Sequence, residues 1–159
     1  MATVGIDSQL CFALYSASRA MTAAYRPILA ELDLTYPQYL VLLVLWEEER
    51  RADGGVTVRR LGERLHLDSG TLSPLLKRLE ANRLVRRTRS RDDERVVEVT
   101  LTAAGRRLEE KAQCIPARLG AATGFTEKRA ADLRDAVRQL TDALDASTEG
   151  ESREDALHR

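Results

Sequence analysis

The sequence lacks any long apolar run, and it has only two cysteines and two histidines in 159 residues. No apolar stretch approaches the roughly 20 residues that a helix needs to cross a bilayer. The first residues also lack the basic and then apolar pattern of a signal peptide. We therefore expect a cytoplasmic protein without a membrane partner, in which the cysteines are free thiols rather than one disulfide.

The charge of the chain is balanced overall but unevenly distributed. The 25 basic and 25 acidic residues cancel. The segment from Arg59 to Arg95, however, contains 11 basic and 6 acidic residues, and the rest of the chain is correspondingly acidic. A polyanion is attracted to such a basic segment, and the attraction weakens as the salt concentration rises.

Residues 57–102 show the pattern of a helix, a turn, a second helix and a two-stranded hairpin. Thr57 is placed to cap the first helix, whose apolar residues recur at helical spacing. A proline deep inside a helix removes a hydrogen bond, so Pro74 predicts that the second helix begins near Gly70 or Thr71. The pattern is that of a winged helix-turn-helix, which places its second helix in the major groove of double-stranded DNA.

The second helix and the hairpin carry the residues that we expect to contact DNA. Side chains at the start of the helix are expected to contact base edges and phosphates. Basic side chains one turn later are expected to contact phosphate. The hairpin strands are expected at about 84–90 and 95–101, with arginines on the first strand contacting phosphate and Arg95 probing a minor groove. The alternatives are an intrahelical ion pair for Arg78, a solvated edge for the arginine-rich strand, and a plain turn for Asp93. The expected contacts are Ser69, Thr71, Ser73, Lys77, Arg78, Arg86, Arg89, Asp93 and Arg95.

Amphipathic helices are expected on both sides of this segment, at 8–34 and 103–146. Each has a narrow apolar seam that a monomer would leave partly exposed, so we predict a homodimer built from these terminal helices. Pro27 predicts a kink or a break in the first helix, and the polar segment 147–159 is expected to be disordered. The predicted fold is mainly α with a small β-hairpin wing: one domain over 8–146, with a winged helix-turn-helix between N- and C-terminal dimerisation helices. We expect one continuous helix after the hairpin, with four apolar residues in register along it: Leu108, Ala112, Ile115 and Leu119.

A further helix, apolar on every face, is expected at residues 40–46 and should lie in the core. Thr35 and Gln38 stand three positions apart and predict a capping box at its start. Tyr36 and Tyr39 flank that start. For Tyr39 we favour core packing with the hydroxyl group in water.

Cys11 stands in the first turn of the N-terminal helix. If Ser8 is the N-cap, free backbone N–H groups and the helix dipole would lower the pKa of the Cys11 thiol and raise its reactivity. The alternative is a small apolar packing residue, since buried cysteines are usually inert. A thiol peroxidase is less favoured, because His66 and His158 lie elsewhere in the sequence and Cys11 has no apparent catalytic partner.

Four segments resemble a known family of regulators: LCFALYSASRAMT, LTYPQYLVLLVLWE, LDSGTLSPLLKRLE and RDDERVVEVTLTAAG. All four resemble the MarR family, and the first two resemble its OhrR group of organic-hydroperoxide-sensing repressors, over residues 9–144. The resemblance implies a homodimer with two winged helices and neither metal nor cofactor. It also implies that Cys11 is the redox-sensing residue. Tyr25 and Tyr36 of the partner subunit would then hydrogen-bond the Cys11 thiolate, with a contribution from Tyr15.

The function implied by this resemblance is a repressor of a peroxide-detoxification gene. An organic hydroperoxide would oxidise Cys11 to sulfenic acid and so release a pseudo-palindromic operator. Some members of the group resolve this acid with a second cysteine, but theirs lies near the position of Ala121 here. Capture by a low-molecular-weight thiol is therefore preferred to a disulfide with Cys114, which would be a packing residue. A MarR-type repressor released by a reversible phenolic ligand is the alternative.

Overall fold

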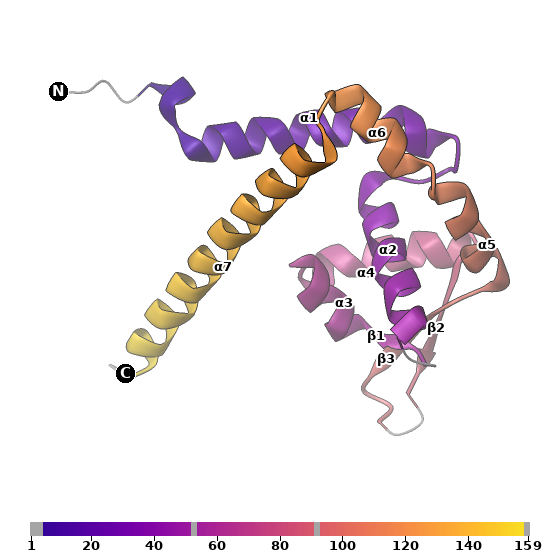
Figure 1. Cartoon of the computed structure of the whole chain (residues 1–159). Helices are drawn as coiled ribbons and strands as arrows, with labels where there is room; N and C mark the ends of the chain where they lie inside the picture. The colour runs from indigo at the N-terminus through magenta and orange to yellow at the C-terminus, as the bar shows by residue number, and fades with distance from the viewer. Residues whose placement is uncertain (1–4, 52–53, 91–92, 158–159) are drawn as a thin grey trace. The chain divides into compact units, whose positions relative to one another are not determined.

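A computed structural model of the protein describes residues 5–51, 54–90 and 93–157, with side chains as far as residue 147 (Figure 1). The chain divides after Pro116 into two compact units. The first unit contains η1 (Ile6–Ser8), α1 (Leu10–Ala30), α2 (Tyr36–Arg51), β1 (Val56–Thr57), α3 (Val58–Leu65), α4 (Ser69–Ala81), β2 (Val85–Arg89), β3 (Val97–Leu101) and α5 (Ala103–Ala112). Helix α6 (Ile115–Thr123) spans the division, and α7 (Glu127–Leu157) belongs to the second unit. This confirms the predicted class, mainly α with a small β wing.

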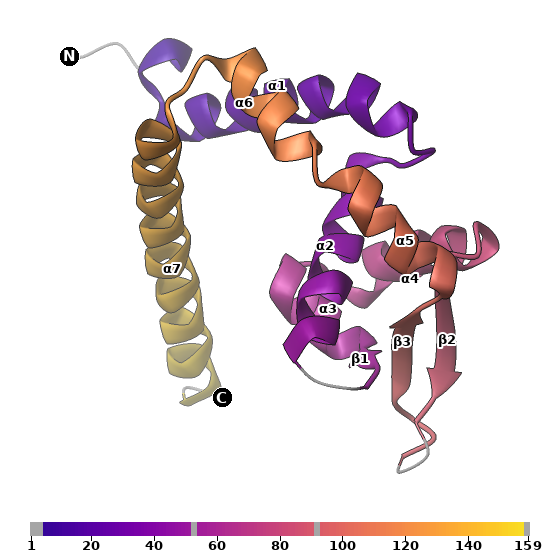
Figure 2. The same cartoon turned by 45° about the vertical axis from the view of Figure 1, so that its right-hand side comes forward.

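Helix α2 is the centre of the first unit and contacts α1, α3, α4, α5 and β3 (Figures 1 and 2). Within residues 40–46 its side chains are buried on almost every face, as expected, and Leu43 is the exception at 39% exposed. The predicted pairing at its start is also present. The side-chain oxygen of Gln38 accepts hydrogen bonds from the backbone N–H of Thr35 at 2.8 Å and from its hydroxyl group at 3.0 Å. Helix α2 therefore connects the N-terminal helix with the helix-turn-helix.

Two threonines cap helices of the first unit, and the cap by Thr57 was predicted from the sequence. Thr57 accepts a hydrogen bond from the backbone N–H of Arg60 at 3.1 Å and so begins α3. Thr102 accepts one from the backbone N–H of Gly105 at 3.1 Å and begins α5. Such caps satisfy N–H groups that have no partner within the helix, so local sequence alone fixes these two starts.

Helix α4 begins earlier than predicted, at Ser69 rather than at Gly70 or Thr71. The carboxylate of Asp68 caps it, accepting the backbone N–H of Thr71 at 2.9 Å. Pro74 consequently stands inside the helix. The cap satisfies donors at the helix start, and this outweighs the single hydrogen bond that the proline removes.

The wing belongs to an antiparallel sheet of three strands, in the order β1-β3-β2. Strands β2 and β3 form the predicted hairpin, but β1 was not predicted. It is two residues long, too short to show an alternating pattern, and pairs Val56 with Val99. The close approach requires Gly55, because a Cβ atom there would lie 2.8 Å from the Cβ atom of Glu98.

Helix α1 begins later than predicted and is continuous. Its N-cap is Gln9, whose side chain makes no capping hydrogen bond, while the hydroxyl group of Ser8 donates to the carbonyl of Gly5 at 2.7 Å. Cys11 is therefore the second helical residue rather than the third. The predicted break at Pro27 is absent, because the proline stands in the last turn, where it costs one hydrogen bond and leaves the preceding turns intact.

The helices after the hairpin also differ from the prediction. The expected single register across Ala112 and Ile115 is interrupted, because α5 ends at Ala112 and α6 begins at Ile115. Pro116 explains the interruption, since it is tolerated in the first turn of α6 but not inside a longer helix. Helix α7 reaches Leu157, so most of the segment 147–159 is helical and not disordered as predicted. That segment has no proline and several glutamates, which favour helix even in a polar sequence. No helix among the described residues is both long and apolar enough to span a membrane.

Candidate functional site

A groove of about 520 Å³ lies between the start of α3, the first turns of α4 and the wing. Arginines line it from all sides except that of α4: Arg59 from α3, Arg87 from β2 and Arg95 from the wing. Ser73 of α4 also faces it. The groove therefore joins the helix and the wing that are expected to enter DNA, and its walls are positively charged.

The residues predicted to contact DNA lie on the surface, and Ser73 alone among them is half-buried. Two of the hydroxyl groups bond within α4. The hydroxyl of Thr71 donates to the carboxylate of Asp68 at 2.8 Å, and that of Ser73 donates to the carbonyl of Ser69 at 2.7 Å. These bonds hold the hydroxyl groups against the helix and leave their remaining lone pairs for a nucleic-acid donor.

Strand β2 directs neighbouring arginines to different surroundings. The Nε and Nη2 atoms of Arg87 donate to the Glu80 carboxylate of α4 at 2.9 and 2.6 Å, and the Arg87 backbone N–H donates to it at 2.9 Å. These bonds lower the pKa of the Glu80 carboxyl group. Arg86 instead lies beside Thr102 and Ala103 at the start of α5. Of this pair, Arg86, which was named among the expected contacts, is thus outside the groove. Arg87, which was expected to contact phosphate only as part of the arginine-rich strand, lines it. Strand alternation was the signal that could have distinguished them.

The basic residues of the helix-turn-helix and wing fall into two sets. Arg59, which the sequence prediction did not name as a contact, lines the groove but pairs with Glu63 of its own helix at 2.9 Å. Among the described basic residues of this region, six make no ion pair: Lys77, Arg78, Arg83, Arg86, Arg89 and Arg95. The carboxylate of Asp93 accepts the backbone N–H of Arg95 at 2.9 Å, so it shapes the turn. These side chains without an ion pair can bind phosphate without first breaking an internal one.

Cys11 and the predicted tyrosine pair lie at opposite ends of α1. Cys11 is exposed in the first turn, and Tyr25 lies fourteen residues later. The helical rise separates the two by about 21 Å along the axis. The Tyr25 ring packs against Tyr36 of α2, with ring centroids 4.7 Å apart. Within one chain the thiol therefore does not contact this pair, and any contact requires a second chain.

Tyr15, the third predicted tyrosine, lies one helical turn after Cys11 on the same face of α1. Its side chain is 58% exposed. The guanidinium group of Arg19 lies 5.6 Å from the ring centroid, and its Nη1 atom donates to the phenol oxygen at 3.5 Å. The start of α1 thus presents a thiol, a phenol and a cation together.

Tyr25 and Tyr36 are placed to remain hydrogen-bond donors at neutral pH. Burial raises the pKa of Tyr25 to about 12, and the neighbouring phenols of Tyr36 and Tyr39 add to the effect. Burial also raises the pKa of Tyr36. A protonated phenol donates to an anion such as a thiolate and stabilises its charge. Tyr39 is 3% exposed and packs on Tyr25, as its predicted core role requires.

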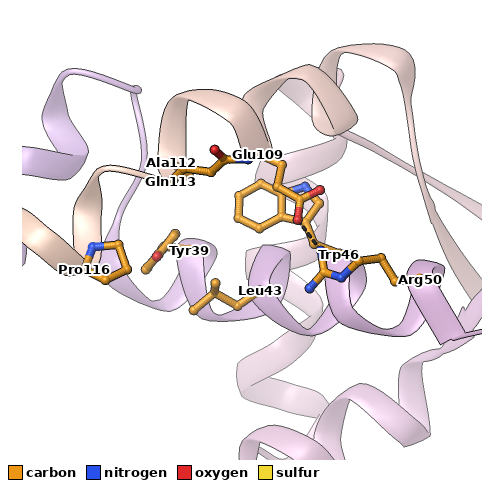
Figure 3. Close-up of a pocket in the computed structure, with 8 residues that line it drawn as sticks. All are labelled: Tyr39, Leu43, Trp46, Arg50, Glu109, Ala112, Gln113 and Pro116. Atoms are coloured by element: carbon orange, nitrogen blue, oxygen red, sulfur yellow. Dashed lines mark hydrogen bonds and ion pairs between the residues drawn. The ribbon is translucent and has the colours of Figure 1, made fainter. Parts of the chain in front are cut away.

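A smaller hollow of about 140 Å³ lies between α2 and the junction of α5 and α6 (Figure 3). Its walls include the apolar side chains of Leu43 and Trp46 and the ring of Pro116. An ion pair between Arg50 and Glu109 stands at one end, drawn as a dashed line in Figure 3. The hollow is open, mostly apolar and small.

Cys114 lies near this hollow, in the interruption between α5 and α6. It is exposed, and its Sγ atom donates to the carbonyl of Lys111 at 3.5 Å. The pKa of Tyr39 is raised mainly by burial, then by Tyr36 and by Cys114. Among the described residues, no cluster of histidine, cysteine, aspartate or glutamate could hold a metal ion.

Comparison with known proteins identifies regulators of transcription. A family model described as transcriptional regulator SarA/Rot matches residues 23–112. The HTH-type transcriptional regulator TtmR of Methylorubrum extorquens is 54% identical over 141 residues, which are 89% of this chain and 70% of that protein. The organic hydroperoxide resistance transcriptional regulator of Bacillus subtilis is 48% identical over 139 residues, 87% of this chain and 86% of that protein.

A solved structure supports the same assignment. The chain superposes on AbfR of Staphylococcus epidermidis with a TM-score of 0.71 at 33% identity, over 91% of this chain and 94% of AbfR. Reduced AbfR has also been solved bound to DNA, and that structure matches with a TM-score of 0.63 at 33% identity, over 87% of this chain and 93% of that one. The family resemblance that the sequence motifs indicated is therefore confirmed, and the chain belongs to the MarR-type family of transcriptional regulators.

Proposed function

We propose that this regulator is a homodimeric repressor that senses organic hydroperoxides through Cys11. The observation that carries the proposal is the separation of parts within one chain. An exposed thiol begins α1, and two protonated phenols with raised pKa values lie at its other end. Antiparallel pairing of α1 with its copy would bring the thiol of one subunit to Tyr25 and Tyr36 of the other. The thiolate would there accept hydrogen bonds from both hydroxyl groups.

The exposed apolar residues support pairing between two chains. Leu10 and Met21 on α1 are 61% and 38% exposed, and Leu133 and Leu144 on α7 are 52% and 57% exposed. Burying them against a second copy would remove these apolar surfaces from water. The dimer would also present two helix-turn-helix units to a pseudo-palindromic operator.

The oxidation is a two-electron step. The Cys11 thiolate attacks the terminal oxygen of the hydroperoxide, the O–O bond breaks, and the departing alkoxide takes a proton from water to give an alcohol. The sulfur becomes a sulfenic acid, so its negative charge is lost and the tyrosines lose an anionic acceptor. A low-molecular-weight thiol can then condense with the sulfenic acid and release water. Tyr36 is the first residue of α2, so its altered contacts would act directly on that helix. Helix α2 in turn contacts both helices of the helix-turn-helix.

Operator release tests this assignment. The reduced protein would first select its preferred duplex from a random library, and binding to that duplex would be measured by fluorescence anisotropy with and without cumene hydroperoxide. We expect the native protein and Cys114→Ser to lose affinity by about 5- to 150-fold, the range typical of coupling between sites. Cys11→Ser should bind equally in both conditions, and sedimentation should show that it remains a dimer. If Cys11→Ser still releases the duplex, the sensor is not this thiol.

The hollow beside Tyr39 favours one second candidate, release by a reversible small phenolic ligand. The hollow is open and lined by apolar side chains with a charged pair at one end, which suits a small amphipathic molecule. Intact mass spectrometry separates the two mechanisms. A released complex with unmodified cysteines supports the ligand, whereas oxidised Cys11 supports the sensor, and continuing peroxide turnover with a thiol reductant would indicate a thiol peroxidase.

A further inference from the structure

The C-terminal end of α2 carries a run of charged residues, Glu47 to Arg51, that bonds to two different neighbours. Glu47 and Glu48 bond to α3 of the helix-turn-helix. Glu49 and Arg50 bond to α5. Successive helical residues point about 100° apart, so one short run can reach both sides.

The contacts with α3 centre on Arg64. Its Nη2 atom donates to the Glu47 carboxylate at 2.6 Å, and its Nη1 atom donates to the Glu48 carboxylate. Arg60 approaches Glu48 at 3.5 Å, and Arg51 bonds to Glu47 at 2.6 Å. We name these five residues the α2–α3 ion network.

This network is more sheltered than an ordinary surface ion pair. The side chains of Arg64 and Glu48 are 26% and 20% exposed. The guanidinium fork of Arg64 spans two carboxylates, which fixes its direction as well as its distance. The Glu47 contact raises the pKa of Arg64 and lowers that of Glu47, so this pair stays charged at neutral pH. An exposed pair such as Arg59–Glu63, at 90% and 50% exposure within one helix, provides none of these constraints.

The network stands where α2 can set the position of the helix-turn-helix. Tyr36 begins α2, and Glu47 and Glu48 lie near its other end. Arg64 lies in the last turn of α3, immediately before the turn that leads to Asp68 and α4. A displacement at the start of α2 can therefore pass along a rigid helix and through Arg64 to the DNA-contacting helix.

We propose that Glu48 and Arg64, with Glu47, are positioning residues that couple the Tyr36 end of α2 to the DNA-binding helix. This inference rests on the proposed peroxide response, and it adds the route by which the response reaches the DNA. The network holds α3 in one orientation on α2. Without it, α3 and α4 no longer follow α2, and the affinities of the reduced and oxidised proteins converge.

Glu48→Gln tests the proposal, with Glu63→Gln as its matched control. Each substitution removes one negative charge from the helix-turn-helix region, so simple electrostatics predicts slightly tighter DNA binding for both. The proposal predicts a different outcome for Glu48→Gln alone. Its ratio of reduced to oxidised affinity should fall at least 5-fold, while Glu63→Gln keeps the native ratio. Arg64→Gln should resemble Glu48→Gln, and the double variant should be no worse than either. Equal ratios for Glu48→Gln and Glu63→Gln would overturn the coupling role.

Hydrogen exchange of the reduced protein keeps this inference separable from the peroxide response. If hydroperoxide does not change the DNA affinity of the native protein, the proposed function is wrong. The α2–α3 ion network is then tested by amide exchange alone. Glu48→Gln should accelerate exchange in α3 and the start of α4 without affecting α1, whereas Glu63→Gln should not alter α4. Unchanged exchange in α3 and α4 of Glu48→Gln would show that the network does not hold these helices.

Discussion

Gly105→Ala offers a severe test of how α5 packs on the rest of the first unit. Gly105 is buried in the first turn of α5. A Cβ atom there would lie 2.2 Å from the carbonyl oxygen of Leu84 and 3.1 Å from Leu101 Cδ2. The backbone oxygen cannot move away as the end of a flexible side chain would, so α5 must shift. The carbonyl of Gly105 also accepts the Trp46 indole N–H at 3.0 Å, and a shift of α5 would break this buried bond.

The cost can be worked from these contacts. Overpacking a close-packed site costs about 1–3 kcal/mol. A buried donor left without its partner costs about 1–3 kcal/mol more. Alanine has a higher helix propensity than glycine, which offsets about 1 kcal/mol of this loss. Gly105→Ala should therefore lower the free energy of unfolding by roughly 1–5 kcal/mol.

Urea unfolding followed by tryptophan fluorescence measures this change, because Trp46 is the single tryptophan. The protein concentration must be fixed, since the stability of a dimer depends on it. Gly120→Ala is the control: a Cβ atom at Gly120 in α6 meets no atom within 4 Å, so the same substitution should be neutral or slightly stabilising. A loss of less than about 1 kcal/mol in Gly105→Ala would refute the packing described for Leu84 and Trp46.

Two further predictions concern the tyrosine pair and the wing. The pKa of folded Tyr25, about 12, lies above the ordinary 10.0, so its neutral phenol stabilises the folded protein below pH 10 and this contribution is lost as the pH rises toward 12. Tyr25→Phe should unfold in urea with a weaker pH dependence across that window, and an unchanged dependence would contradict the burial of the phenol. Arg95→Gln should weaken operator binding and reduce the slope of log affinity against log salt by about 1, as expected for one lost phosphate contact. Arg107→Gln on α5 should leave that slope unchanged, and equal slopes for both variants would remove Arg95 from the interface.

The features that the sequence predicted correctly depend on near neighbours in the chain. Thr57 and the pair of Thr35 and Gln38 act within one helical turn, so residue type and spacing are enough to place them. The start of α4 was misplaced because two local signals conflict there. Pro74 argued for a later start, and the Asp68 cap prevailed.

The features that were missed depend on contacts between distant residues. Strand β1 exists only because β3 pairs with it from 43 positions away at Val56 and Val99. The bonds from Arg64 to Glu47 and Glu48 span 17 and 16 positions and leave no periodic pattern. The roles proposed for Cys11, Tyr25 and Tyr36 rest on the family resemblance, because a site formed between two chains would leave no pattern in the residue spacing of one chain.

The bond between Glu80 and Arg87 has a consequence for how this regulator can diverge. Three hydrogen bonds tie the wing to α4 through one carboxylate, so the separation of the two elements that we expect to contact DNA is set within the protein itself. We therefore expect substitutions at the wing tip, such as those replacing Arg95, to alter minor-groove preference without changing the contacts that α4 makes with DNA. In lineages that keep Glu80 and Arg87, we expect the DNA preference of the wing and that of α4 to change independently. Where either partner is lost, we expect the two preferences to change together.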